Sequence, residues 1–200
     1  MLPKSPRNLN VFRSYFYTSG TDDKEIRSRV IQARKCITCL NGILWSKDIR
    51  KKRKLNIYSY NALIKSSLLY GAETWRITEN NKRRVEATEM DALRRSSRIS
   101  RKDRIRNVTI RQQTGLVETI IKEIEQNQLT WYGHVQRMAE ERLPKIALKW
   151  MPKQKRARGR PKENWMEGIK KAMNERILNE GQWENRKQWS LGVGQRRKAF

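Results

Sequence analysis

Residues 22–44 have the sequence DDKEIRSRVIQARKCITCLNGIL, and this stretch decides the class of fold. Its apolar residues recur at alternating spacings of four and three, which places them on one stripe of an α-helix. The stripe consists of Ile26, Val30, Ala33, Ile37, Leu40 and Leu44. Asp22 and Glu25 resemble a capping box at the start of this helix, where the helix dipole favours negative charge. We therefore expect an amphipathic helix with basic outer faces, and a mostly α-helical fold.

Five further segments have helical periodicity or helix boundary signals. A second helix is predicted from about Lys52 to Tyr70, ended by Gly71 and packed against the first helix as a hairpin. Thr78 is the expected N-cap of a third helix, whose sparse apolar residues predict that most of it is solvated. Its stripe is Val85, Ala92, Leu93 and Ile99. Further helices are expected at 107–115, at 117–138 and from Trp165 to about Gly181, with a frayed tail at 191–200.

The charge balance of the chain indicates a polyanionic partner. Lysine and arginine total 46 against 20 acidic residues, which gives a formal net charge of +26. This excess is far beyond what solubility requires, and it favours nucleic acid as the partner. No apolar run approaches the ~20 residues that span a bilayer, and residues 1–10 lack the apolar core of a signal peptide. We therefore expect an intracellular protein of the nucleus and cytoplasm, with no membrane partner.

The sequence offers little to a metal ion or a cofactor. Cys36 and Cys39 are its two cysteines and His134 is its single histidine, so neither a disulfide framework nor a four-ligand zinc site can be assembled. We interpret the two thiols as structural, because they lie within the first predicted helix. Asp22 and Asp23 are adjacent carboxylates like those that hold metal ions in polymerases, but they fit the start of a helix better. No metal or cofactor is predicted for this chain.

Three stretches are rich enough in cations to bind phosphate, and we predict that they contact nucleic acid without reading its sequence. The first is the junction between the first two helices, with Lys47, Arg50, Lys51, Lys52, Arg53 and Lys54. The second is the third helix, with Arg83, Arg84, Arg94, Arg95 and Arg98. The third is an exposed loop at 151–162, with Lys153, Lys155, Arg156, Arg158, Arg160 and Lys162. A solvated loop or a nuclear-import signal is the alternative for this third stretch.

An aromatic segment near residue 131 has two interpretations. Trp131, Tyr132 and His134 could stack on bases or exchange protons, or they could be structural residues of the helix at 117–138. The structural alternative is favoured, because Trp131 continues an apolar stripe and His134 has no evident acidic or nucleophilic neighbour. The sequence contains no phosphate-binding loop, nucleophile elbow or zinc-protease motif. We therefore expect no catalytic activity from this chain.

Five blocks of the sequence occur in a characteristic order. They are Gly20 to Ile26 (GTDDKEI), Leu68 to Trp75 (LLYGAETW), Leu93 to Arg95 with Asp103 to Asn107, Leu129 to Met138 (LTWYGHVQRM), and Gly159 to Lys162 leading to Trp165. Together they resemble the C-terminal part of endonuclease–reverse transcriptases from LINE-type retrotransposons, which lack long terminal repeats. The resemblance extends from about Tyr15 to Trp189. Arg13 to Phe16 (RSYF) departs from the Tyr-Leu-Gly turn of relatives, which fits a truncated or decaying copy of such an element.

This resemblance implies a fragment that comprises the polymerase thumb and a basic C-terminal region. A remnant of a strand and turn would occupy 1–20, a thumb-like helical bundle 21–75, and a loosely packed basic helical region 76–190. The family's endonuclease domain, and the polymerase fingers and palm with their catalytic acids and divalent metal, would precede Met1. The fragment would hold template–primer, element RNA or target DNA by electrostatic contacts during target-primed reverse transcription. The alternatives are a polymerase or endonuclease activity inherited from the parent protein, and a truncated reading frame without function.

Overall fold

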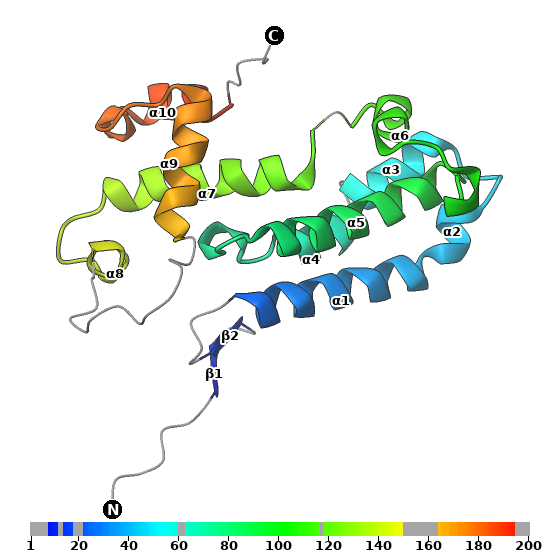
Figure 1. Cartoon of the computed structure of the whole chain (residues 1–200), viewed down its shortest axis with the longest axis horizontal. Coiled ribbons are helices and arrows are strands. Elements are labelled where there is room, and N and C mark those ends of the chain that lie inside the picture. The colour runs from blue at the N-terminus through cyan, green and yellow to red at the C-terminus, as the bar shows by residue number, and fades with distance from the viewer. Residues whose placement is uncertain are drawn as a thin grey trace, which may run out of the picture. The chain divides into compact units, whose positions relative to one another are not determined.

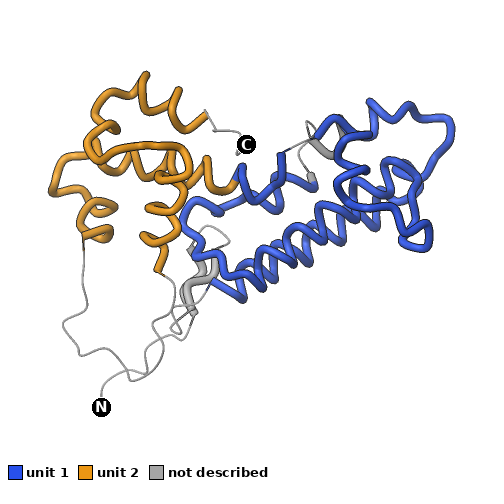
Figure 2. The backbone as a smooth tube through the Cα atoms, turned by 45° about the horizontal axis from the view of Figure 1, so that its top comes forward, with its two compact units in different colours: residues 1–123 blue, residues 124–200 orange. Residues whose placement is uncertain are grey.

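The chain is mostly α-helical, as the sequence predicts (Figure 1). The computed structural model describes residues 8–11, 14–17, 22–59, 63–116, 118–149 and 164–194. They form two compact units, Met1–Glu123 and Ile124–Phe200 (Figure 2). The boundary therefore lies near residue 123 and not near Trp75, where the sequence places the end of the first helical bundle. The helices that follow Trp75 belong to the first unit, because they pack against the helices before it.

The first unit begins with two short strands. β1 (Asn8–Val11) pairs with β2 (Ser14–Tyr17) in an antiparallel two-stranded sheet. In this register Asn8 lies opposite Tyr17, and Val11 lies opposite Ser14.

The stretch at 22–44 forms two helices. α1 (Asp23–Cys39) is followed by the short helix α2 (Asn41–Trp45). The predicted apolar stripe is the buried stripe, since its members Ile26, Val30, Ala33, Ile37 and Leu44 are all buried. Leu40 lies between the two helices and is only half-buried. Gly42, which has low helix propensity, follows within the next turn.

Asp22 occupies the N-cap position of α1, but its side chain does not cap that helix. Its Oδ2 atom instead accepts a hydrogen bond of 2.6 Å from the backbone N–H of Arg76. The predicted capping role was therefore wrong, because a backbone donor from a distant part of the chain takes the carboxylate. Burial raises the pKa of the Asp22 carboxyl above its ordinary value, and the hydrogen bond from Arg76 offsets part of this increase.

The raised pKa of Asp22 gives the first testable prediction. The folded chain binds this proton more tightly than the unfolded chain, so the free energy of unfolding falls as pH rises from the unfolded pKa through the folded one. Asp22→Asn keeps an oxygen acceptor for Arg76 and carries no charge, so we expect it to remove this fall. Thermal melts of both chains between pH 3 and pH 7 measure the effect. Two parallel curves of melting temperature against pH would contradict the prediction.

The second predicted helix also forms as two. α3 (Lys51–Ser59) and α4 (Leu63–Leu69) replace the single helix expected from Lys52 to Tyr70, and residues 60–62 lie outside the described part of the chain. α4 packs against α1, as the predicted hairpin requires. Its buried residues are Ile64 and Leu68, whereas Leu69 is half-buried, because contact with α1 sets the buried face. Gly71 is left-handed, with φ +71°, as expected for a helix terminator.

α5 (Glu79–Ser96) corrects the expectation that the third helix is largely solvated. Thr78 caps its start, where its side chain accepts a hydrogen bond of 3.4 Å from the Asn81 N–H. The helix then packs against α1, α2, α3, α4 and α6 (Asn107–Thr114). Its buried residues are Asn81, Val85, Thr88, Glu89, Met90, Ala92, Leu93 and Ser96. The apolar pattern of the sequence does not predict that these positions are buried, because half of the buried residues are polar.

The buried polar residues of α5 find partners inside the first unit. Asn81 Nδ2 donates to Asp23 Oδ1 at 2.6 Å, and Thr88 Oγ1 donates to the Arg84 carbonyl at 2.9 Å. Glu89 forms an ion pair with Arg111 of α6. A buried polar group is stable only when it is hydrogen-bonded, and these contacts meet that need. α6 itself ends at Gly115, which is left-handed as predicted, although its N-cap is residue 106 and not 107.

The second unit contains most of α7 (Ile120–Gln136), together with α8 (Leu143–Lys149), α9 (Trp165–Arg176) and α10 (Arg186–Gly194). The predicted basic loop at 151–162 lies outside the described residues. Two other expectations need correction. α9 ends at Arg176, because Ile177 is left-handed with φ +54°, and not at Gly181. The chain is helical to Gly194 and Val193 is buried, so the tail is not frayed from residue 191.

An aromatic core holds the second unit together. It consists of Leu129, Tyr132, Ile169, Ala172, Met173, Leu178, Trp189 and Val193, with Trp165 and Trp183 packed against it. Trp189 Nε1 donates to the Leu129 carbonyl at 3.1 Å, which fixes the indole against α7. Gly133 lies beneath that ring, since a Cβ at this position would come within 2.2 Å of Trp189 Nε1. The core therefore depends on the absence of a side chain at residue 133.

This close approach gives the second prediction. Gly133→Ala is expected to lower the free energy of unfolding by about 1–3 kcal/mol, because the rigid, buried Trp189 ring must move. Gly168→Ala is the matched control, since a Cβ at that helical position meets open space and should be neutral or stabilising by up to about 1 kcal/mol. Urea denaturation of the two variants measures both effects. Equal effects of the two substitutions would contradict the predicted clash.

Candidate nucleic-acid interface

The junction between α2 and α3 keeps four of its six predicted cations on the surface. Lys47, Arg50, Lys52 and Arg53 are exposed. Lys51 is half-buried, and its Nζ donates to the Gln113 carbonyl at 2.7 Å. This bond joins the start of α3 to the end of α6.

Lys54 was wrongly predicted to face phosphate. Only 1% of the residue is exposed, and its Nζ donates to the Ser46 carbonyl at 2.5 Å. Ser46 is the C-cap of α2, where a cation is favourable beside the carbonyl end of the helix. Burial lowers the pKa of the Lys54 ammonium, and the nearby charge of Arg98 lowers it further. Lys54 therefore anchors the start of α3 to the C-terminal end of α2.

The arginines predicted on the third helix fall into two groups. Arg83 and Arg98 are exposed, whereas Arg84, Arg94 and Arg95 are half-buried. Arg84 donates to Asn81 Oδ1 at 3.4 Å. Arg83 and Arg98 are accessible to phosphate. The three half-buried arginines instead form hydrogen bonds within the first unit.

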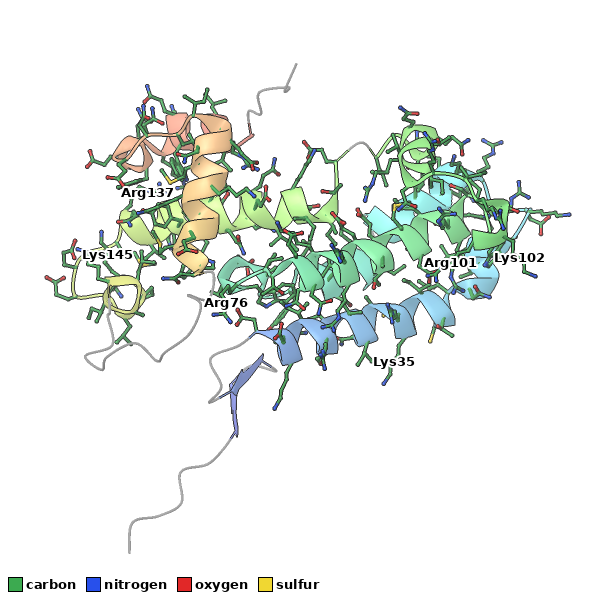
Figure 3. All side chains as sticks on the ribbon, viewed as in Figure 1. Lys35, Arg76, Arg101, Lys102, Arg137 and Lys145 are labelled. Carbon is green, nitrogen blue, oxygen red and sulfur yellow. The ribbon has the colours of Figure 1, made fainter. Side chains whose placement is uncertain are left out.

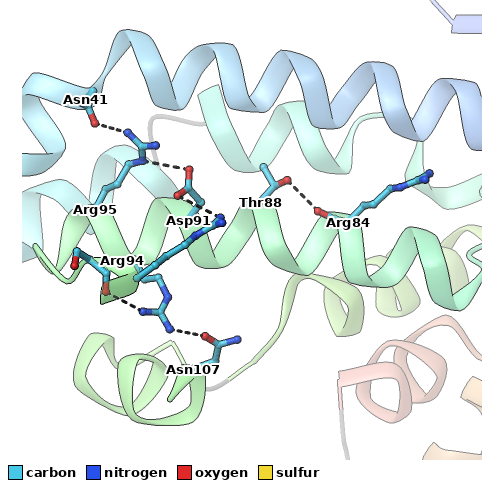
Figure 4. Close-up of polar contacts among 9 residues, drawn as sticks. Asn41, Arg84, Thr88, Asp91, Arg94, Arg95 and Asn107 are labelled. Atoms are coloured by element: carbon cyan, nitrogen blue, oxygen red, sulfur yellow. Dashed lines mark hydrogen bonds and ion pairs between the residues drawn. The ribbon is translucent and has the colours of Figure 1, made fainter. Parts of the chain in front are cut away.

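Arg94 fixes the segment that follows α5 (Figure 4). Its Nη2 donates to the Ile105 carbonyl at 2.7 Å and to Asn107 Oδ1 at 2.9 Å. Its Nη1 donates to the Ser100 carbonyl at 3.4 Å. The guanidinium thus supplies donors to a loop of its own unit, which the positive charge of the sequence alone does not indicate.

Arg95 connects α5 to α2 in a similar way (Figure 4). Its Nε lies 3.2 Å from Asp91 Oδ2, and its Nη1 donates to Asn41 Oδ1. The carboxylate and the amide hold the guanidinium in one orientation. A fixed guanidinium loses less entropy when it binds a further ligand than a mobile one does.

A basic turn at 98–106 is a set of candidate binding residues that our sequence prediction missed, apart from Arg98. Its exposed cations are Arg98, Arg101, Lys102, Arg104 and Arg106. Asp103 is its one acid, and Asp103 Oδ2 accepts a hydrogen bond of 2.7 Å from the Ser100 N–H in a capping box of the 3₁₀ helix Arg101–Asp103. Five cations within nine residues between two helices are the signal that would have found it.

The junction and the basic turn lie at the same end of the first unit. α3, which begins within the junction, packs against α5, which ends just before the basic turn. Figure 3 shows Arg101 and Lys102 beside α2 and the end of α5. We call this surface the basic end, and it comprises the exposed cations Lys47, Arg50, Lys52, Arg53, Arg98, Arg101, Lys102, Arg104 and Arg106.

A groove of about 590 Å³ opens at the basic end. We call it the arginine groove, and its lining residues come from α1, α2, α5 and the basic turn. They are Arg34, Asn41, Trp45, Ala87, Asp91, Arg94, Arg95, Ile99, Ser100 and Arg101. Four arginines and one aspartate leave an excess of three positive charges in this lining.

The aromatic segment of α7 favours its structural interpretation. Tyr132 is 6% exposed, and its ring centroid lies 5.6 Å from that of Trp183 and 6.5 Å from that of Trp189. Trp131 is half-buried and packs edge-on against Trp165, with centroids 5.5 Å apart. Burial raises the pKa of the Tyr132 hydroxyl. His134 is exposed.

The part of the chain that the structure describes offers no evident place for a metal ion. Within it, no three His, Cys, Asp or Glu side chains lie close enough together to hold one. Cys36 and Cys39 are both free thiols. Among the same residues, no helix has the length and apolar character needed to cross a bilayer.

Comparisons with known proteins do not identify a family for this chain. No protein-family model matches its sequence. No curated protein and no solved structure is significantly similar to it. The resemblance of its sequence blocks to retrotransposon reverse transcriptases therefore stays a hypothesis.

Proposed function

We propose that this chain binds nucleic acid through the basic end of its first unit, by electrostatic contacts with phosphate. The observation that carries the proposal is the charge of that surface. Residues 47–53 and 98–106 contribute nine exposed cations, against the two acids Asp48 and Asp103. One of these acids is engaged in its own capping box. The basic end therefore has a large excess of positive charge, which favours binding to a polyanion.

Counterion release provides the affinity of such a surface. Each lysine or arginine that neutralises a phosphate displaces condensed cations from the nucleic acid, and this gain is independent of base sequence. Guanidinium groups suit the role because they stay charged and bind phosphate oxygens in pairs. We expect tight binding at low salt, weak sequence preference and a steep loss of affinity as salt rises. The loop at 151–162 would add further contacts of the same kind.

We further propose that the chain derives from a retrotransposon reverse transcriptase. In such a protein, it would hold template–primer, element RNA or target DNA during target-primed reverse transcription. The ordered sequence blocks support this proposal. Two of those blocks also have clear structural roles: Leu68 to Trp75 passes from α4 through the left-handed Gly71, and Leu129 to Met138 supplies Tyr132 and Gly133 to the core of the second unit.

Fluorescence anisotropy with a labelled mixed-sequence duplex tests the proposal. Between 50 and 200 mM salt, we expect the logarithm of the affinity to fall linearly with the logarithm of the salt concentration, with a slope of about −0.9 for each phosphate contact. An affinity that is unchanged over this range would overturn the proposal.

Two further assays separate the alternatives. A primer-extension assay tests inherited polymerase activity, and we expect no template-dependent incorporation. Circular dichroism during heating tests a reading frame without function, since a cooperative loss of helical signal indicates a specific fold.

A further inference from the structure

Two walls of different chemistry form the arginine groove. Asn41 and Trp45 are four residues apart, which places them on one side of α2, and Arg34 comes from the preceding helix α1. Asp91 and Arg95 are spaced by four residues on the facing side of α5. The groove volume of about 590 Å³ lies within the ~300–1,000 Å³ typical of small-ligand sites. The groove is therefore large enough to take in part of a polymer chain.

The arginines of the groove differ in how much of their hydrogen-bonding capacity is used. Arg95 is held by Asp91 and Asn41, and Arg94 is held by the loop that follows α5. The Arg101 side chain is 79% exposed, and its Nη2 lies 4.0 Å from Asp91 Oδ1. Arg34 is exposed as well. Arg34 and Arg101 thus carry accessible charges, beside the hydrogen-bonded guanidinium groups of Arg94 and Arg95.

Trp45 provides the feature that phosphate binding alone does not explain. This indole is 37% exposed, and it lines a groove whose other large side chains are mainly arginines. A flat aromatic surface beside arginines matches the sites that bind single strands, where bases stack on aromatic rings and cations hold the backbone. Bases in a continuous duplex are already stacked on their neighbours. An unpaired base can therefore cover Trp45 at little cost, whereas a paired base must first leave its helix.

We infer that the arginine groove binds an unpaired nucleotide, with its base stacked on Trp45 and its phosphate held by Arg34 and Arg101. The inference rests on the proposed function and specifies the substrate: single strands and strand ends are preferred over continuous duplex. The stacking surface and the cations serve RNA and DNA alike. Both kinds of single strand are expected to bind.

The test compares three labelled ligands of equal length by fluorescence anisotropy on the full chain at one salt concentration. They are a mixed-sequence DNA strand, the same strand with abasic sites in place of its bases, and the duplex. Strand and abasic strand carry the same phosphates, so their ratio isolates stacking. An RNA strand of the same sequence forms a fourth arm. Wild type is expected to bind the strand roughly 10-fold more tightly than the abasic strand.

Trp45→Ala is expected to remove this roughly 10-fold preference, while changing duplex affinity by less than about 2-fold. Trp45→Phe retains an aromatic face and should restore part of the preference. Ile43→Ala is the matched control, because Ile43 is an exposed apolar residue of the same short helix and does not line the groove. Circular dichroism of each variant shows whether the helical fold is retained.

The outcomes distinguish the inference from the proposed function. If wild type binds the strand, the abasic strand and the duplex equally, or if Trp45→Ala weakens all three alike, the inference fails and electrostatic binding remains. If wild type binds none of them in a salt-dependent way, the proposed function fails first. Lys35→Gln and Arg34→Gln add a further pair, since both cations are exposed on α1 and only Arg34 lines the groove. Equal losses in this pair would also count against the groove.

Discussion

Replacing Arg98, Lys102, Arg104 and Arg106 with glutamine is expected to weaken duplex binding on the order of 10³-fold at 0.1 M salt. These four residues are exposed cations of the basic turn, and none of them forms an ion pair within the described part of the chain. If each neutralises one phosphate, losing all four lowers the slope of log affinity against log salt by about 3 to 4. Anisotropy titrations at several salt concentrations yield both the slope and the affinity.

A matched variant separates the basic end from net charge. Lys170, Lys171, Arg186 and Lys187 are exposed cations of the second unit, and replacing them with glutamine removes the same formal charge. We expect this variant to lose much less affinity and to keep a slope close to that of the wild type. Equal losses in the two variants would mean that total charge governs binding, and that the basic end has no special role.

Trp189→Ala is expected to destabilise the second unit by about 3–5 kcal/mol, the usual cost of truncating a large buried aromatic residue. Trp189 is 2% exposed, packs near the rings of Tyr132 and Trp183, and donates to the Leu129 carbonyl. The alanine leaves a cavity in the core and removes the hydrogen bond that joins α10 to α7. Hydrogen exchange followed by mass spectrometry should show faster exchange in α9 and α10.

Trp189→Phe refines this prediction. Phenylalanine keeps most of the ring contacts but cannot donate to Leu129, so the expected cost is smaller, about 1–3 kcal/mol. Hydrogen exchange in α1 and α5 of the first unit should stay unchanged if the effect is confined to the second unit. A cost below about 1 kcal/mol for Trp189→Ala would show that Trp189 does not organise the core.

Much of the helical framework is visible in the sequence, because the signals that specify it are local. Apolar residues three and four apart predict the buried stripe of α1. Thr78 marks the start of α5, and Gly71 and Gly115 occupy left-handed positions at helix ends. Each signal involves residues within one or two turns of each other. Such signals do not depend on how the rest of the chain packs.

The position of α5 could not be predicted in this way. Its sequence has a sparse apolar stripe, yet it packs against five other helices. Asn81 and Glu89 become buried because Asp23 and Arg111, far away in the sequence, supply their partners. The polarity of a residue does not show whether a distant residue will supply the hydrogen bond that offsets the cost of burying it.

The candidate interface shows the same division. The sequence by itself determined that the chain is helical and strongly basic, because periodicity and net charge are properties of neighbouring residues and of composition. The tertiary structure decided which cations face solvent. It buries Lys54 against Ser46, fixes Arg95 on Asn41 from 54 residues away, and brings the basic turn beside Trp45. A cation binds phosphate only if its hydrogen bonds are not already taken, and the groups that take them come from distant parts of the chain.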